Sequence, residues 1–168
     1  NDLEALVLDV GQGQSVLLRS GNYLALVDCG GDSYDNPGDI AADYLANLGR
    51  DTLDLLVLTH FHTDHANGIP QLLERVDVAV LAVPDVDLDN PLRESILTQA
   101  EEARTEVWFI EDDYTITLDD GTVFRLFAPL TIGETNEEGL TVLCSSDAFD
   151  TLITGDMNSE VEQLLLSH

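Results

Sequence analysis

Three of the four histidines in this chain lie within six residues, in the segment HFHTDH at positions 60–65. The segment directly follows the apolar run Leu53 to Leu58, whose length and composition predict a buried strand. On a loop at the end of a strand, His60 and His62 can point the same way while Asp64 and His65 turn to a neighbouring position. Imidazole and carboxylate ligands suit Zn²⁺, Mn²⁺ or Fe, so the segment predicts a metal site. The alternative is a surface loop in which Asp64 caps a following helix.

Strand and helix patterns alternate along the chain and predict an α/β (α+β) domain with two sheets and helices packed outside them. The first three strands, joined by glycine-centred turns, predict an antiparallel meander, and residues 59–68 are predicted to be a polar loop. The predicted strands cover residues 3–10, 15–19, 23–29, 53–58, 78–83, 107–110, 115–118, 122–127, 140–145 and 151–154. The predicted helices cover residues 39–48, 69–76, 91–103 and 159–166.

Length and charge exclude several classes of protein. A chain of 168 residues with 44% hydrophobic residues suits one folded domain and argues against disorder. It contains no lysine, which excludes Schiff-base chemistry. Its net charge of −27 argues against nucleic-acid binding through a broad basic face. No apolar run is long enough to span a bilayer and no signal peptide is evident, so a soluble domain is expected.

Three motifs resemble those of the metallo-β-lactamase superfamily. HFHTDH matches its HxHxDH signature, LVDCGG around Asp28 is similar to its early aspartate motif, and LITGD ending at Asp156 is similar to the strand that supplies its bridging aspartate. The resemblance covers essentially the whole chain in the expected order. It implies an αββα sandwich with metals at the edges of the sheets.

Two further segments resemble a narrower group, the C-terminal hydrolase domain of ComEC-like competence proteins. LDVGQGQS, residues 8–15, is similar to the opening of that domain, and NEEGLTVL, residues 136–143, is similar to a segment that precedes the bridging aspartate there. The resemblance implies DNA uptake, nuclease activity and a full-length protein that is membrane-associated, on the extracytoplasmic face of a bacterial membrane or secreted. The oligomeric state stays open.

Carried over by position, the resemblance implies two divalent metal ions, Zn²⁺ or Mn²⁺. His60 and His62 would hold one ion, Asp64 and His65 the second, and Asp156 would bridge them, with Asp64 and Asp156 as catalytic residues. Such a pair of ions activates water to hydroxide near neutral pH. Support from a second layer is expected from Asp28 and Asn136. Residue-level alternatives are a helix cap at Asp156 and an ordinary turn residue at Asp28.

The GQG segment has two interpretations. Gly11 and Gly13 either form a tight turn near the metals, where the backbone could approach a phosphate, or form a turn and nothing more. Dinucleotide binding is excluded because the third glycine and a following helix are missing.

The chain departs from the family pattern at three points. Gln14 stands where the competence group has Asp, no third histidine lies between His65 and His168, and the terminal His-Gly motif has no counterpart. The second metal site is therefore incomplete in this chain. We expect residues 1–168 to form a single domain that lacks its C-terminal closing elements and continues past His168 in the full protein.

The motifs favour a competence-type phosphodiesterase or nuclease that cleaves DNA by metal-activated hydroxide. The strong acidity opposes this, because two divalent ions would offset only four of the charges and DNA would meet a repulsive field. One alternative is a hydrolase of the same fold acting on a small phosphoester, thioester, lactone or β-lactam. Another is a metal-poor, non-enzymatic binding module.

Overall fold

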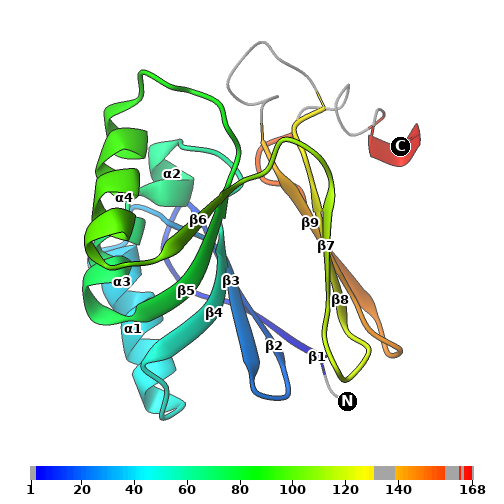
Figure 1. Cartoon of the computed structure of the whole chain (residues 1–168). Coiled ribbons are helices and arrows are strands. Elements are labelled where there is room, and N and C mark those ends of the chain that lie inside the picture. Colours follow the sequence, from blue (N-terminus) through cyan, green and yellow to red (C-terminus); the bar gives the residue numbers. More distant parts are fainter. Residues whose placement is uncertain (1–2, 131–138, 158–162, 164, 168) are drawn as a thin grey trace.

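Two stacked β-sheets and a layer of helices form the molecule (Figure 1). The computed structural model describes residues 3–130, 139–157, 163 and 165–167. One sheet has six strands in the order β1-β2-β3-β4-β5-β6, and the other has four in the order β10-β9-β8-β7. The helices α1 to α4 lie on the outer face of the six-stranded sheet, and the second sheet covers its inner face. The fold is an α/β sandwich, as the sequence predicts.

The elements follow the predicted order. The six-stranded sheet is built from β1 Leu3–Val7, β2 Gln14–Ser20, β3 Tyr23–Gly30, β4 Thr52–Val57, β5 Asp77–Val83 and β6 Glu106–Phe109. The four-stranded sheet is built from β7 Tyr114–Thr117, β8 Val123–Phe127, β9 Thr141–Ser145 and β10 Asp150–Ile153. The helices are α1 Pro37–Asn47, α2 Thr63–Ala66, α3 Ile69–Arg75 and α4 Pro91–Glu102.

The six-stranded sheet changes direction at β3. The strands β1 to β3 form the predicted antiparallel meander, whereas β3, β4, β5 and β6 run parallel. The register pairs Val27 of β3 with Val57 of β4. Since the carboxyl ends of parallel strands meet at one edge of a sheet, the loops that follow β3 and β4 emerge side by side. That edge carries both the aspartate motif and HFHTDH.

Apolar side chains pack in two cores, one on each face of the larger sheet. In β3, Leu24 and Leu26 point to the helices, while Ala25 and Val27 point to the second sheet. The alternation follows from the two-residue period of a strand. A strand buried on both faces reads as a continuous apolar run, which explains the sequence YLALV. The sheets are thus held in a fixed relation by the core between them.

Two local predictions were wrong. The first strand ends at Val7, not at Val10. Leu8 and Val10 are buried because they pack in the core under the helices after the chain leaves the sheet, and apolar residues alone could not reveal this. The predicted loop 59–68 contains the short helix α2, Thr63–Ala66, since four residues are too few to show a helical period.

Most of the predicted C-terminal helix, residues 159–166, lies outside the described residues, and only 163, 165 and 166 of it are described as helical. The helices α1 to α4 all pack on the six-stranded sheet (Figure 1). Within the described ranges, no helix is long and apolar enough to cross a membrane.

Candidate metal centre

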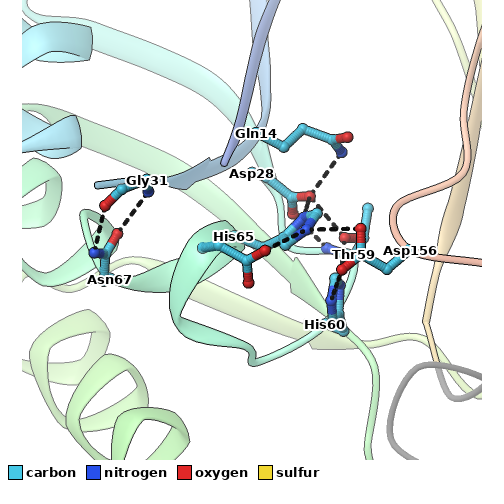
Figure 2. Close-up of polar contacts among 9 residues, drawn as sticks. Gln14, Asp28, Gly31, Thr59, His60, His65, Asn67 and Asp156 are labelled. Atoms are coloured by element: carbon cyan, nitrogen blue, oxygen red, sulfur yellow. Dashed lines mark hydrogen bonds and ion pairs between the residues drawn. The ribbon is translucent and has the colours of Figure 1, made fainter. Parts of the chain in front are cut away.

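Side chains from both sheets meet at the carboxyl edge of β3 and β4 (Figure 2). Two groups could each hold a metal ion, and within each group the ligand atoms lie within 4.8 Å of one another. The groups are His60, His62 and Asp156, and Asp64, His65 and Asp156. The structure therefore brings together all five residues that the resemblance implies as ligands.

Asp156 belongs to both groups. Its Oδ1 atom lies 3.2 Å from Nε2 of His65, and its Oδ2 atom lies 3.7 Å from Nε2 of His60. Each carboxylate oxygen thus faces a different histidine. Asp156 follows β10 and comes from the four-stranded sheet, whereas the histidines follow β4. The preceding Gly155 has a positive φ of 60°, and a Cβ there would lie 2.9 Å from Oγ1 of Thr59, so glycine lets this loop reach the histidines.

Asp28 lies beneath the site with no exposed surface. Its Oδ1 accepts a hydrogen bond from the backbone N–H of Thr59 at 2.7 Å. Its Oδ2 accepts from Oγ1 of Thr59 at 2.7 Å and from Nε2 of Gln14 at 2.8 Å, and lies 2.7 Å from Nδ1 of His65. Asp28 also has a positive φ of 60°. These donors hold the buried carboxylate in place, and through its contact with Nδ1 it orients the His65 ring.

His60 is buried and neutral at neutral pH. Burial, followed by the neighbouring charge of His65, lowers the pKa of His60 to about 4. Its Nδ1 lies 3.0 Å from Oγ1 of Thr59. Its Nε2 is buried and has no hydrogen-bond partner in the described part of the chain. A buried nitrogen without a partner is unfavourable in a folded protein, and a metal ion at Nε2 would satisfy it. The donor set therefore fits a metal.

His65 has the opposite electrostatic setting. Burial lowers its pKa, but the hydrogen bond to Asp28 and the charges of Asp28, Asp156 and Asp64 together raise the pKa above its ordinary value. The ring lies between two carboxylates, with Nδ1 at Asp28 and Nε2 at Asp156. A cation at Nε2 would replace the proton that this negative environment favours.

The remaining two residues lie on the solvent side. His62 is half-buried at the start of α2, and its ring centroid lies 4.7 Å from that of His60. The Asp64 side chain is 50% exposed, with Oδ2 3.6 Å from Nε2 of His65. The site thus has a buried floor and an accessible rim, which is the arrangement that a substrate needs.

Glycines let helix α2 approach the sheet. A Cβ on Gly13 would lie 2.6 Å from the carbonyl oxygen of Asp64 and would also overlap the backbone of Gly30 and Gly31. The predicted role of Gly13 in a turn near the site is compatible with this contact. Gly11 has a positive φ of 75° and packs against Asp32.

Sequence comparison identifies the family. The profile described as the metallo-beta-lactamase superfamily matches residues 8–168. The chain belongs to this superfamily. A comparison with curated proteins found no significant match, and the narrower resemblance to competence proteins stays a prediction.

Solved structures of the superfamily fold are similar at low sequence identity. A Thermotoga maritima protein named as a candidate metallo-beta-lactamase is 16% identical with a TM-score of 0.66, over 99% of this chain and 92% of that one. The protein YhfI from Bacillus subtilis is 16% identical with a TM-score of 0.62, over 92% of this chain and 64% of that one. CmlA, a diiron beta-hydroxylase from Streptomyces venezuelae, is 19% identical with a TM-score of 0.62, over 99% of this chain and 33% of that one. The fold thus houses different chemistries and does not by itself define the reaction.

Some residues escaped the sequence analysis. Thr59, Gln14 and Asn67 were not assigned to the site, although Thr59 and Gln14 contact Asp28 directly and Asn67 makes two hydrogen bonds to the backbone of Gly31. The sequence indicated Gln14 only as a departure from the competence-group pattern, and Thr59 and Asn67 only by their proximity to HFHTDH. The predicted supporting residue Asn136 lies outside the described residues.

Proposed function

We propose that this protein is a metal-dependent hydrolase with two metal ions, and that its substrate is a phosphodiester, with DNA as the first candidate. The observation that supports a paired centre is the carboxylate of Asp156, which is shared by two groups of ligands. When bound, two divalent ions supply a hydroxide nucleophile near neutral pH and positive charge for an anionic substrate.

The ligands on this proposal divide into two sets. His60 and His62 would hold one ion, Asp64 and His65 would hold the other, and Asp156 could contribute to both. Buried His60 and His65 form the rigid floor, and half-exposed Asp64 and Asp156 border the solvent. Because the carboxylates of Asp64 and Asp156 lie on the solvent side of the site, they would be placed to accept a proton from the attacking water. This supports the assignment of Asp64 and Asp156 as catalytic residues.

The test is cleavage of single-stranded DNA by purified protein with added Mn²⁺ or Zn²⁺. We expect cleavage that depends on the metal and that falls at least 100-fold in the double variant His62→Ala and Asp64→Ala, since one ligand of each ion is removed. Asp147→Asn is the matched control, because Asp147 is exposed in the turn between β9 and β10. Activity that persists in the double variant would exclude this metal centre as its source.

The acidity of the chain supports a second candidate, a small ester substrate. A net charge of −27 repels a polyanion but hardly affects a small neutral molecule such as a lactone or a thioester. A panel of phosphodiester, phosphomonoester, thioester, lactone and β-lactam substrates separates the two candidates. Turnover of a neutral ester with none of DNA would favour the second candidate.

A purified protein that takes up well under one metal ion per chain would instead favour a binding module.

A further inference from the structure

Thr59 connects Asp28 to the second buried histidine. Its backbone N–H and its hydroxyl both donate to Asp28, each at 2.7 Å. Its hydroxyl oxygen also lies 3.0 Å from Nδ1 of His60. Thr59 is itself fully buried, so water does not compete for these bonds.

The direction of each bond follows from the count of protons. An ionised carboxylate only accepts hydrogen bonds, and a hydroxyl has a single proton to donate. The Thr59 proton therefore points to Asp28, and the Thr59 oxygen can only accept from His60. Nδ1 of His60 must then carry the proton, which leaves Nε2 as a lone pair that faces Asp156 (Figure 2).

Asp28 sets the position of the proton on the His65 ring by direct contact. Its Nδ1 lies 2.7 Å from Asp28, so Nδ1 donates and Nε2 is the atom left for a metal. Gln14 completes the set of donors around Asp28 with its side-chain amide, which can donate where a carboxylate at this position could not. Three of the four donors contact Oδ2 of Asp28, and the backbone N–H of Thr59 contacts Oδ1.

We infer that Thr59 is a positioning residue that lets a single buried carboxylate, Asp28, orient one histidine in each of the two ligand groups. Asp28 acts on His65 directly and on His60 through the Thr59 hydroxyl, and Gln14 holds the carboxylate in place. The inference deepens the proposed metal centre and rests on it. Partners that hold the other ring nitrogen of a metal-binding histidine commonly change metal affinity by 10-fold to 100-fold.

The first experiment measures the His60 tautomer in metal-free protein by a long-range proton–nitrogen correlation spectrum. At about pH 8, above the ordinary imidazole pKa of about 6.5, we expect His60 with its proton on Nδ1. The chain has only four histidines, so assignment by single substitutions is practical. A wild-type His60 with its proton on Nε2 would overturn the inference, and this measurement needs no variant at Thr59.

The second experiment compares Thr59→Val with Thr59→Ser by competition titration with Zn²⁺. Valine has the shape of threonine and keeps the backbone bond to Asp28 but has no hydroxyl, whereas serine keeps the hydroxyl. We expect Thr59→Val to weaken metal binding about 10-fold and to populate the Nε2 proton on His60, and Thr59→Ser to restore both. Equal affinity and an unchanged tautomer in Thr59→Val would refute the relay. Neither readout uses a substrate, so an absence of DNA cleavage would count against the proposed function alone.

Discussion

Asp156 and His65 lie 3.2 Å apart although they come from different sheets, His65 from α2 beside the six-stranded sheet and Asp156 from the loop after β10. A metal ion bound by both residues would join the two sheets at this edge. Because a ligand that binds only the folded state stabilises it, metal binding should raise the stability of the whole sandwich.

We therefore expect added Zn²⁺ or Mn²⁺ to raise the melting temperature. At about 100 times the dissociation constant the gain is about 2.7 kcal/mol, or roughly 5–10 °C for a chain of this size. Asp156→Asn should lose most of this shift, whereas Asp147→Asn should retain it. Differential scanning calorimetry with and without metal is the measurement. A full shift in Asp156→Asn would show that the ion binds elsewhere.

Metal affinity should fall as the solution becomes more acidic through neutral pH. The pKa of His65 is raised above its ordinary value of 6.5, so its protonated form persists toward neutrality and a metal must displace that proton. Below the raised pKa we expect about a tenfold loss of affinity per pH unit, the effect of one displaced proton. His60 adds no competition above about pH 5 because its pKa is lowered to about 4.

Calorimetric titration in two buffers with different ionisation enthalpies would count the protons released. Uptake of metal without any proton release at pH 6, and equal affinity at pH 6 and pH 8, would contradict the raised pKa of His65.

Salt should stabilise this fold. Of the charges on the chain, 33 are acidic and 6 are arginines, and the described ion pairs use Arg19, Arg50, Arg75 and Arg93. The excess negative charge repels itself in the compact state. Increasing the ionic strength from 0.1 M to 1 M shortens the screening length from about 10 Å to about 3 Å. We expect the melting temperature to rise by several degrees, and a fall would contradict this account of the acidity.

Helix α4 offers a matched pair of charge reversals. Its exposed Glu94 lies in the first turn, and its exposed Glu102 lies at the last residue, where no basic side chain is present. Both changes to lysine alter the net charge equally, but the helix dipole favours a cation only at the C-terminus. Glu102→Lys should therefore be more stable than Glu94→Lys by about 0.5–2 kcal/mol at low salt. Urea unfolding of both variants measures the difference, which should shrink at high salt.

Gly13 should tolerate no side chain. Its missing Cβ lies where the backbone of Gly30 and the carbonyl of Asp64 pack, so Gly13→Ala should cost about 1–3 kcal/mol by overpacking and weaken metal binding by moving Asp64. Gly21→Ala is the control, because a Cβ at Gly21 would contact no other atom. Its only cost would be the backbone strain of a positive φ. Equal metal affinity in the two variants would mean that α2 adjusts without moving its ligands.

The sequence alone was sufficient for the element order and for naming the five candidate ligands. Strand and helix periods are local properties, so nearly every predicted element is present. HFHTDH carries four of the candidate ligands within six residues. Local patterns were insufficient where apolar residues are buried outside a strand. Leu8 and Val10 pack under the helices and do not continue β1.

The tertiary structure decided which atoms face one another. Asp28 contacts His65, which is 37 positions away in the sequence, and Gln14, which is 14 positions away. These contacts depend on the register of β3 with β2 and β4. The positions of the two oxygens of Asp156 depend on how one sheet packs on the other through the core between them. Hydrogen bonds act over about 3 Å, so partners set by sheet register and packing leave no trace in the spacing of residues along the chain.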